Sequence, residues 1–419
     1  FYLLGPEQRG GAPAGAACQS LSRPGRGEGT AASAFRGEHH RLSGHPSKDG
    51  RIGLFRLALP RVCLCKLGRL QPHRQCVRDA AVTRAVKTII MSIKGIFTPN
   101  ITPFREDHSI NEEELRRYIN WLIEKGVSGL YPNGSSGEFI RLGFEERKRV
   151  AQIVAEENRG RVPILAGAAE ANLELVLKAA AYCADFGCTA VSVTGPYYYK
   201  VSQESIEHYF RELAARSPID IILYNIPQFS NEIGVEVVRR LAADCPRIVG
   251  IKDSSRDMPR FMSTLSKVKA ERPEFACLIG CEEILLPSLL MGADGGTIAS
   301  SGVAPEALMK LYTAFQNGRM EEARQVQFKL LELIETMLGA GNFPEGFREG
   351  VNLRGFDMGR ARQPMSPNEL EHFGAIREKL ACLLAECGFG EAARHCGSGA
   401  REDLASTVDA IVRAVLQGR

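Results

Sequence analysis

The stretch "FGCTAVSV", residues 186–193, decides the fold. A glycine closes a segment of helical period, and a short apolar run of strand type follows within a few residues. The same arrangement recurs in "KGVSGLY", residues 125–131, and in "MGADGGTI", residues 291–298. In each stretch the glycine stands where a left-handed residue ends a helix. This recurrence indicates repeated units in which strands and helices alternate along the chain.

Eight such units follow one another after Met91. We expect strands near residues 96–98, 129–131, 162–166, 190–194, 221–225, 248–252, 276–280 and 295–299. Helical patterns lie near 111–125, 144–158, 172–186, 203–217, 235–243, 257–271, 284–291 and 305–317. Eight βα units predict a closed (β/α)₈ TIM barrel over residues 91–318. A doubly wound open sheet is the alternative, and it requires a Gly-rich phosphate turn after the first strand, which "GIFTPNITPF" (95–104) does not provide.

Four segments flank this barrel. Residues 319–386 predict a C-terminal helical appendage, 387–400 a Gly-rich linker, and 401–419 an amphipathic tail helix. Residues 1–90 are rich in Arg, Gly and Pro without hydrophobic period, so we expect a disordered or non-native extension. A transit peptide is one explanation of that extension. Upstream sequence translated ahead of a true start at Met91 is the other.

Charge and cysteine patterns narrow the function class. Residues 1–90 carry 15 Lys and Arg against 5 Asp and Glu, whereas the remaining residues carry 38 against 44. The main body is therefore mildly acidic and predicts no nucleic-acid partner. No apolar run approaches the roughly 20 residues needed to span a bilayer, so we expect no membrane segment. The twelve cysteines form no CxxC pair, which predicts no metal site and favours reduced thiols in a cytoplasmic protein.

The strand ends carry the chemistry, because reacting groups in such barrels lie at the carboxyl ends of the strands. Lys252 ends the apolar run of "RIVGIKDSS", residues 247–255. Loss of solvation favours its neutral, nucleophilic amine, which forms a Schiff base with a carbonyl substrate. Tyr224 on the neighbouring strand suits a proton shuttle. Ser135 and Ser136 stand in a Gly-flanked turn that suits a carboxylate, so the set predicts an enzyme that grips a 2-oxo acid and makes or breaks a carbon–carbon bond.

Each of these residues also has a structural explanation. Lys252 alone is explained by a strand-end lysine that reaches solvent, and Tyr224 alone by a core tyrosine. The turn alone is an ordinary turn, and the tyrosines of 197–199 alone form a buried cluster or a subunit contact. Glu282 and Glu283 alone are acids at a helix start. Their joint placement at one end of one barrel favours the catalytic interpretation.

Four motifs follow in order on the predicted strands: "NGSSGE" (133–138), "PYYYK" (196–200), "LYNIP" (223–227) and "GIKDSS" (250–255). Together they resemble the dihydrodipicolinate synthase / N-acetylneuraminate lyase superfamily of pyruvate-dependent class I aldolases. The resemblance runs from Met91 to about Glu386. It implies a (β/α)₈ barrel with C-terminal helices, a homotetramer, and no requirement for a metal or an organic cofactor.

By this resemblance Lys252 is the Schiff-base lysine and Tyr224 the general acid/base. Ser135 and Ser136 would hold the pyruvate carboxylate. Tyr198 matches the tyrosine that many synthases lend to the neighbouring subunit, although a further tyrosine follows it here. The remaining residues that the resemblance places in the substrate site are Gly137, Ser254 and Thr297.

Departures from the synthase pattern concern the second substrate. Synthases have Ser-Arg-Thr-Gly after "LYNIP", and the arginine binds the carboxylate of aspartate semialdehyde, whereas this chain has Gln-Phe-Ser-Asn at 228–231. "GCEE" (280–283) is similar to the sialic acid lyase pattern, so Glu282 and Glu283 would bind sugar hydroxyls. These features predict a lyase that cleaves a 2-keto-3-deoxy sugar acid into pyruvate and an aldehyde. A 4-hydroxy-tetrahydrodipicolinate synthase, with Arg256 as a substitute clamp, and a non-catalytic 2-oxo-acid-binding protein remain alternatives.

The tail helix predicted over 401–419 places Leu404, Val408, Ile411, Val412 and Val415 on one face. One explanation is a helix that packs on its own oligomer. The other is a docking helix, because the segment resembles the short peptides that recruit enzymes into bacterial microcompartments. The second explanation predicts a protein in the cytoplasm that is encapsulated in a microcompartment shell.

Overall fold

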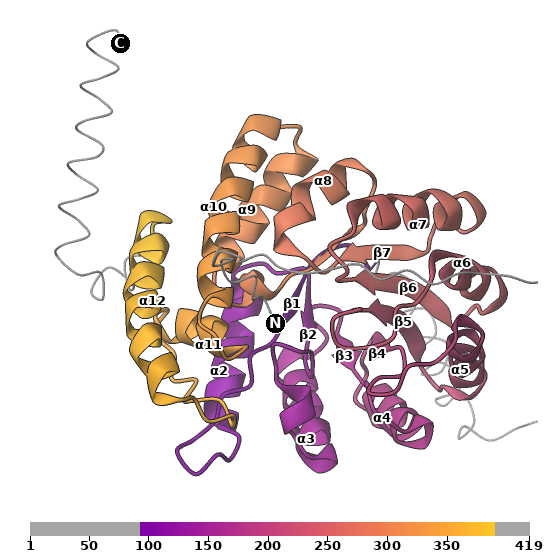
Figure 1. Cartoon of the computed structure of the whole chain (residues 1–419), viewed down its shortest axis with the longest axis horizontal. Helices are drawn as coiled ribbons and strands as arrows, with labels where there is room; N and C mark the ends of the chain where they lie inside the picture. Colours follow the sequence, from indigo (N-terminus) through magenta and orange to yellow (C-terminus); the bar gives the residue numbers. More distant parts are fainter. Residues whose placement is uncertain (1–92, 390–419) are drawn as a thin grey trace, which may run out of the picture. The chain divides into compact units, whose positions relative to one another are not determined.

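The computed structural model describes residues 93–389, and within them eight parallel strands surround a central axis (Figure 1). The strands are hydrogen-bonded in the order β2-β1-β8-β7-β6-β5-β4-β3. A parallel bridge between Leu130 and Ile164 joins β2 to β3 and brings the two ends of the sheet together. This ring confirms the (β/α)₈ barrel and excludes the doubly wound sheet.

The strands and helices alternate as the sequence predicts. The strands are β1 Gly95–Pro99, β2 Gly129–Tyr131, β3 Leu165–Gly167, β4 Ala190–Thr194, β5 Asp220–Asn225, β6 Ile248–Asp253, β7 Ala276–Ile279 and β8 Gly295–Thr297. The helices around them are α2 Glu112–Glu124, α3 Phe144–Asn158, α4 Leu173–Asp185, α5 Gln203–Arg216, α6 Val235–Asp244, α7 Met258–Glu271, α8 Leu285–Leu290 and α9 Pro305–Gln316. Short 3₁₀ turns lie at Phe139–Arg141, Glu282–Ile284 and Ala299–Gly302.

The unit that contains "FGCTAVSV" shows how the local sequence produces one repeat. The Asn172 side chain accepts hydrogen bonds from the backbone N–H groups of Glu174 and Leu175 and thereby caps the start of α4. Gly187 follows the end of α4 with a φ of +79°, a left-handed conformation that a Cβ would disfavour. The chain then turns directly into β4, whose five residues are all buried.

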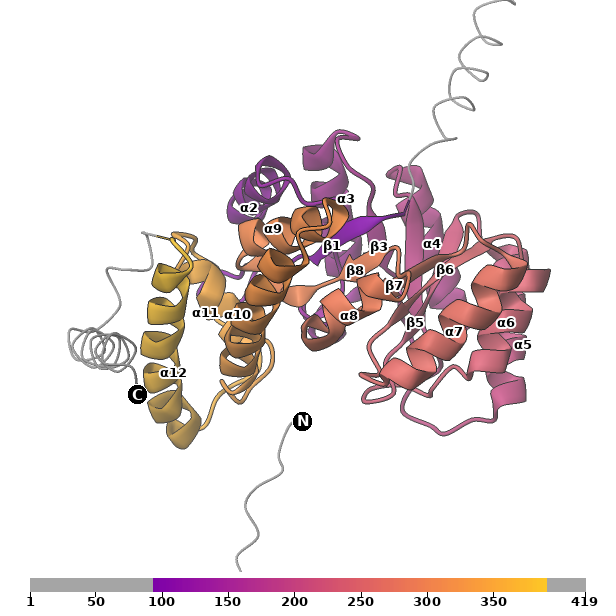
Figure 2. The same ribbon diagram turned by 90° about the horizontal axis from the view of Figure 1, so that it is seen from above.

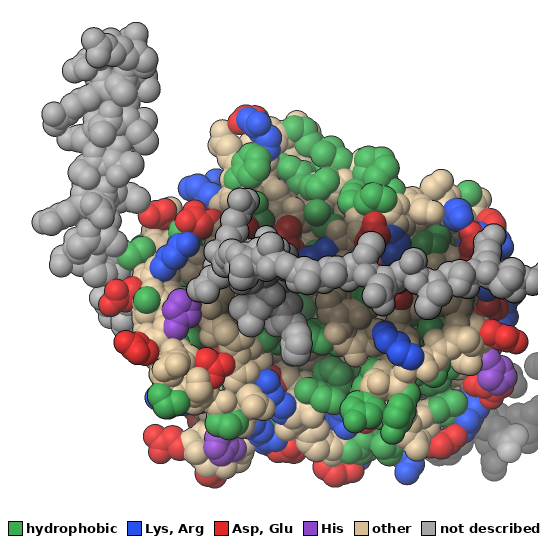
Figure 3. All heavy atoms as spheres, in the orientation of Figure 1, with side chains coloured by type: hydrophobic (Ala, Val, Ile, Leu, Met, Phe, Trp, Pro, Cys, Tyr) green, Lys and Arg blue, Asp and Glu red, His purple; other side chains and the backbone are tan. Residues whose placement is uncertain are grey.

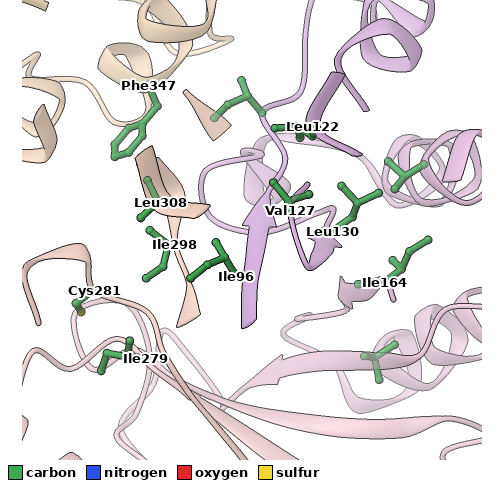
Figure 4. Packing of buried hydrophobic residues seen from close by; sticks show 14 of the residues in the cluster. Ile96, Leu122, Val127, Leu130, Ile164, Ile279, Cys281, Ile298, Leu308 and Phe347 are labelled. Carbon is green, nitrogen blue, oxygen red and sulfur yellow. The ribbon is translucent and has the colours of Figure 1, made fainter. Parts of the chain in front are cut away.

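Two hydrophobic layers hold the barrel. Inside the ring lie Phe97, Tyr131, Leu165, Ala190, Ile222 and Leu278, all of which are buried. Outside the ring, one larger cluster joins the strands to the helices that surround them. Figure 4 shows part of it, with Ile96 from β1 beside Ile298 and Leu308. Because parallel strands are covered on both faces, their sequences are apolar runs rather than alternating patterns.

Three further helices follow the barrel in the described range: α10 Met320–Leu338, α11 Glu345–Asn352 and α12 Pro367–Glu386. α10 lies beside α9, and α11 and α12 lie on the far side of α10 (Figures 1 and 2). Phe347 of α11 and Leu330 of α10 belong to the same hydrophobic cluster as the barrel (Figure 4 labels Phe347). Helices α10 and α12 were predicted, whereas α11 was not, because its eight residues include two glycines and are too few to show a helical period.

Several predictions concern residues outside the described range. The extension 1–90, the linker beyond residue 389 and the tail helix 401–419 are among them. No helix among residues 93–389 is long and apolar enough to cross a membrane. Within that range, six cysteines are free thiols as predicted, but Cys382 is in a disulfide bond, so the prediction is wrong for this residue.

The surface mixes charges of both signs. Acidic and basic side chains alternate over the visible face with no broad field of either (Figure 3). Many of them pair across neighbouring helices, such as Arg149 with Glu112 and Arg240 with Glu207. Such exposed pairs contribute little each, so the hydrophobic cluster carries most of the stability.

The structure predicts that Phe210→Ala destabilises the barrel strongly. Phe210 of α5 is fully buried, so its loss leaves a cavity and should lower the free energy of unfolding by about 3–5 kcal/mol. Phe328→Ala on α10 is the control, because that side chain is 61% exposed and should change stability by at most about 0.5 kcal/mol. Equal losses of unfolding free energy in the two variants, measured by urea unfolding, would contradict the burial of Phe210.

Candidate active site

Lys252 lies inside the carboxyl end of the barrel. It pairs directly with Tyr224, because β5 and β6 align these two residues in parallel register. The Lys252 Nζ atom lies 3.9 Å from the centroid of the Tyr224 ring and 4.5 Å from that of the Tyr131 ring. Lys252 is buried, with 4% of its surface exposed. The two aromatic rings cover the Lys252 amine and shield it from water.

A buried charge network fixes the end of β6. Asp253 is fully buried and forms an ion pair with Arg260. Its carboxylate also accepts hydrogen bonds from the Asn225 side chain, at 3.3 Å, and from the Ser255 N–H, at 2.8 Å. Asp253 thus connects the ends of β5 and β6. These bonds hold Lys252 and Tyr224, one residue earlier on each strand, in a single arrangement.

The serine turn, residues 134–137, follows β2 and lies next to Tyr224. The Ser135 hydroxyl lies 3.5 Å from the Tyr224 hydroxyl, at the limit of a hydrogen bond. Ser136 is buried beside it. Gly137 is required by space, because a Cβ there would lie 2.7 Å from the Asn100 carbonyl oxygen. The structure therefore brings Lys252, Tyr224 and the predicted carboxylate turn together.

Ser254 and Thr297 lie at the same end of the barrel. A Cβ added to Gly280 would lie 2.1 Å from the Ser254 Oγ and 3.1 Å from the Lys252 Cε, so these two side chains converge on Gly280. Thr297 ends β8, and its buried hydroxyl has no hydrogen-bond partner in the described part of the chain. Such a hydroxyl can form a hydrogen bond to a substrate without first breaking one to the protein.

Glu282 and Glu283 face other partners. The buried Glu282 carboxylate accepts a hydrogen bond from the Ser300 N–H at 2.8 Å. Glu283 forms an ion pair of 2.5 Å with Arg256. Burial, with the neighbouring charge of Glu283 as a second cause, raises the pKa of Glu282 above its usual range. Both carboxylates thus already hold protein groups at the end of β7.

Tyr198 points away from its own site. Its side chain is 89% exposed, and its ring stacks edge-on against Tyr199 with 5.0 Å between centroids. The backbone at Tyr198 has a φ of +76°, which a non-glycine residue rarely adopts. Asn231 fixes the loop, because its amide donates to the carbonyl oxygens of Pro196 and Tyr199, each at 2.7 Å. A held, strained and exposed tyrosine is consistent with a contact outside this chain.

A cavity of about 220 Å³ opens beside the serine turn. It is lined by Ser135, Glu138, Phe139, Ile140, Arg141, Thr194, Tyr197, Ile226, Phe229, Ser230 and Phe343. Phe229 stands at the position where the synthase pattern has arginine, and 52% of its surface is exposed. Among these described residues the one cation is Arg141, which is ion-paired with Glu138 at 2.7 Å. The part of the lining that the structure describes therefore carries no unpaired positive charge for a second carboxylate.

Two contributors to the site were missed from the sequence. Tyr131 ends β2 and covers Lys252, and burial raises the pKa of its phenol well above the usual range. Tyr131 was predicted as the last residue of a strand, and that position at a strand end was the available signal for a site residue. Phe343 lies outside the barrel in sequence, so no strand-end argument reaches it. Among residues 93–389, no group of three or more His, Cys, Asp or Glu gathers to hold a metal ion.

Comparison with known proteins agrees with this geometry. Residues 92–382 match the family model of the Dihydrodipicolinate synthetase family. An uncharacterized DapA-like lyase of Pyrococcus horikoshii is 34% identical over 68% of this chain and 99% of its own. A 4-hydroxy-tetrahydrodipicolinate synthase of Methanopyrus kandleri is 34% identical over 70% of this chain and 96% of its own. The crystal structure of YagE, an Escherichia coli protein in complex with pyruvate, matches 71% of this chain and all of its own, with TM-score 0.66 and 28% identity.

The raised pKa of Glu282 predicts that Glu282→Gln stabilises the protein at neutral pH. Between the unfolded and folded pKa values, the folded state holds a proton that the unfolded state releases, so wild-type stability falls as pH rises. Glutamine keeps an acceptor for the Ser300 N–H without the charge. The advantage of the variant should be absent below about pH 4 and grow as pH rises, measured by urea unfolding. Glu274→Gln, an exposed control, should show no such rise, and a pH-independent advantage would contradict the assignment.

Proposed function

The chain belongs to the Dihydrodipicolinate synthetase family of carbon–carbon lyases, and on that premise we propose that it cleaves, or forms, a 2-keto-3-deoxy sugar acid through a Schiff base on Lys252. The products of cleavage are pyruvate and an aldehyde. One observation carries the proposal: a buried lysine amine lies between the rings of Tyr131 and Tyr224, with the Ser135 hydroxyl beside the Tyr224 hydroxyl. A nucleophile, a proton carrier and a hydroxyl donor are thus in contact range.

The reaction begins when the Lys252 amine attacks the C2 carbonyl and water leaves, which gives a protonated imine. Tyr224 then accepts the proton of the C4 hydroxyl as the C3–C4 bond breaks, and the bonding electrons move into the imine. The aldehyde departs, and an enamine of pyruvate remains. Protonation at C3 and attack of water at C2 release pyruvate and regenerate the amine. The imine acts as the electron sink, so the proposed steps use only the substrate, water and protein side chains.

The serine turn would bind the carboxylate of the 2-oxo acid. The Ser135 and Ser136 hydroxyls and the backbone N–H groups around Gly137 are donors of the kind that a carboxylate accepts. The Ser135 hydroxyl also lies at 3.5 Å from Tyr224, so the turn would orient the phenol as well as the substrate. Ser254 and Thr297 supply further hydroxyls at the same end of the barrel.

The choice of a sugar acid rests on the cavity beside the turn. Thr194, Tyr197 and Ser230 bring hydroxyl groups to its lining, and Phe229 replaces the arginine of the synthase pattern. Hydroxyls can bond a polyol, but they do not neutralise a second carboxylate. Glu282 and Glu283 would bind sugar hydroxyls only with the acceptor capacity that Ser300 and Arg256 leave.

A second candidate is a 4-hydroxy-tetrahydrodipicolinate synthase, which condenses pyruvate with aspartate semialdehyde. The similarity to the Methanopyrus kandleri synthase favours it. In this role Arg141 would have to leave Glu138 to meet the second carboxylate, because Arg256 is already held by Glu283. A non-catalytic protein that binds 2-oxo acids is a third candidate, and the retained Lys252 and Tyr224 disfavour it.

The assembly and location belong to the same proposal. We propose a homotetramer in which the exposed Tyr198 joins the proton relay of a neighbouring subunit. Over the chain, we propose a catalytic barrel at 91–318 and a helical appendage at 319–386. The segment 401–419 would then dock the enzyme to a microcompartment shell or to another partner in the cytoplasm.

Borohydride trapping tests the Schiff base. Wild-type protein reduced with borohydride in the presence of pyruvate should gain a mass equal to pyruvic acid minus one oxygen atom, located on Lys252 by peptide mapping. Lys252→Arg should gain nothing, while the control Lys269→Arg, an ion-paired lysine on α7, should gain the same mass as wild type. Folded wild-type protein without an adduct would overturn the aldolase proposal and favour the non-catalytic candidate.

Phe229→Arg tests the basis of substrate choice. The wild type should cleave 2-keto-3-deoxy sugar acids and show little condensation with aspartate semialdehyde. The introduced guanidinium would supply the missing cation, so kcat/KM for aspartate semialdehyde should rise about tenfold or more, in line with a charge-assisted bond of about 1.5–3 kcal/mol. Phe229→Met, a neutral control, should not raise it. If the wild type already prefers aspartate semialdehyde, the sugar-acid lyase is overturned and the synthase is favoured.

A further inference from the structure

Arg348 is the largest fully buried side chain of the described residues, and it comes from outside the barrel. It lies on α11, the helix that the sequence did not predict, and only 1% of its side chain is exposed. Buried guanidinium groups persist only when they are paired and hydrogen-bonded, because desolvation of the charge is costly. The partners of Arg348 therefore indicate its role.

The guanidinium forms hydrogen bonds or an ion pair with four groups. Its Nε donates to Glu345 at 3.0 Å, and its Nη1 donates to the carbonyl oxygens of Thr102 and Met358 at 2.8 and 2.7 Å. Its Nη2 forms an ion pair with Glu138. Two of these partners, Glu345 and Met358, belong to the C-terminal segment itself. The other two belong to the loops that follow β1 and β2.

Both loop contacts converge on the serine turn. Glu138 directly follows Ser135, Ser136 and Gly137, and its own N–H donates to the Ser135 carbonyl oxygen at 3.0 Å. Thr102 donates from its hydroxyl to the Gly137 carbonyl oxygen at 2.8 Å. The Arg348 guanidinium therefore holds both Glu138, at the end of the turn, and Thr102, which hydrogen-bonds to Gly137.

Glu138 is held in an unusual backbone conformation. Its φ of +59° is in the left-handed region, which a residue with a side chain adopts only when its surroundings stabilise it. The ion pairs with Arg348 and Arg141 supply that support, and Arg141 in turn donates to the Asn342 side chain at 3.3 Å. Two bonds from the C-terminal segment therefore act on the same acid, one directly and one through Arg141.

We propose that Arg348 is a positioning residue for the binding of the 2-oxo-acid carboxylate, and that α11 is part of the active site through it. The proposal rests on the proposed function, because it takes the serine turn as the carboxylate site. Arg348 does not touch the substrate. It holds the turn so that the hydroxyls of Ser135 and Ser136 and the nearby N–H groups point to one place before pyruvate arrives. Pre-organised donors bind an anion more tightly than donors that must first be ordered.

Arg348→Lys tests this role, because lysine keeps the charge but loses the planar fork that reaches several partners at once. The single ammonium group can pair with Glu138 or bond Thr102, but it cannot reproduce the four contacts. The KM for pyruvate, and the pyruvate concentration for half-maximal borohydride trapping, should each rise about tenfold, the effect of about 1.4 kcal/mol of lost binding. The kcat should fall less than the KM rises, because the strand register that pairs Lys252 with Tyr224 remains when the contact of Ser135 with Tyr224 is loosened.

Arg354→Lys is the matched control. Arg354 is a buried arginine of the same segment, but it bonds the Val303 carbonyl oxygen and Glu306 on α9 rather than the turn. The substitution should lower the melting temperature comparably while the KM for pyruvate stays at the wild-type value. Glu138→Gln removes the charge of the other partner of this ion pair and should also raise the KM for pyruvate. It decides the matter if Arg348→Lys does not fold.

The outcomes separate this proposal from the proposed function. Wild-type protein without an adduct on Lys252 would refute the Schiff-base function itself. Wild-type trapping with unchanged pyruvate dependence in both Arg348→Lys and Glu138→Gln would overturn the positioning role and leave the function intact. An equal rise in KM in Arg354→Lys would also overturn it, because the effect would then reflect general loosening of the segment. A rise confined to the Arg348 and Glu138 variants supports the proposal.

Discussion

The parallel register between β5 and β6 places Tyr224 opposite Lys252, and the rest of the site depends on this pairing. Side chains at matched positions of neighbouring parallel strands point to the same side of the sheet, and in a closed barrel that side is a dry interior. A shift of one residue would turn the lysine outward. Asp253, at the next position of β6, bonds Asn225 of β5 and Arg260 of α7, and these bonds oppose such a shift. A buried network at the ends of β5 and β6 therefore fixes the register of the candidate site.

The ring also explains why the site gathers residues from distant parts of the chain. β2 and the loop after it supply Tyr131 and the serine turn, β5 and β6 supply Tyr224 and Lys252, and β8 supplies Thr297. Tyr224, Lys252 and Thr297 are held by their own strand ends, whereas the serine turn lies in the loop after β2 and is held from other parts of the chain. The C-terminal helices share the hydrophobic cluster of the barrel, and Arg348 extends that shared packing to the turn. The hydrophobic packing of the C-terminal helices on the barrel therefore also places Arg348 against the serine turn.

Electrostatics set what the cavity can accept. The acids near the barrel mouth are already matched: Glu138 with Arg141 and Arg348, and Glu283 with Arg256. The exposed aromatic ring of Phe229 occupies the place where a synthase arginine is expected. This balance of charges is the reason for proposing a substrate with one carboxylate rather than two. Burial of Glu282 adds a cost that rises with pH, which the bond to Ser300 offsets in part.

The sequence by itself determined the eight units, their order and the residues at the ends of β5 and β6. These features depend on local signals, such as the helix-ending glycine at 187 and the apolar run that ends in Lys252. Tertiary structure alone decided which partners those residues meet. α11 has no readable period, and the contacts of Arg348 with Glu138 and Thr102 span more than 200 residues. Glu282 and Glu283 looked free in sequence, but the fold gives them Ser300 and Arg256 as partners. Charges and hydrogen bonds act between groups that only folding brings together. Helix ends and strand patterns depend on residues that are close in sequence, so they can be predicted without the fold.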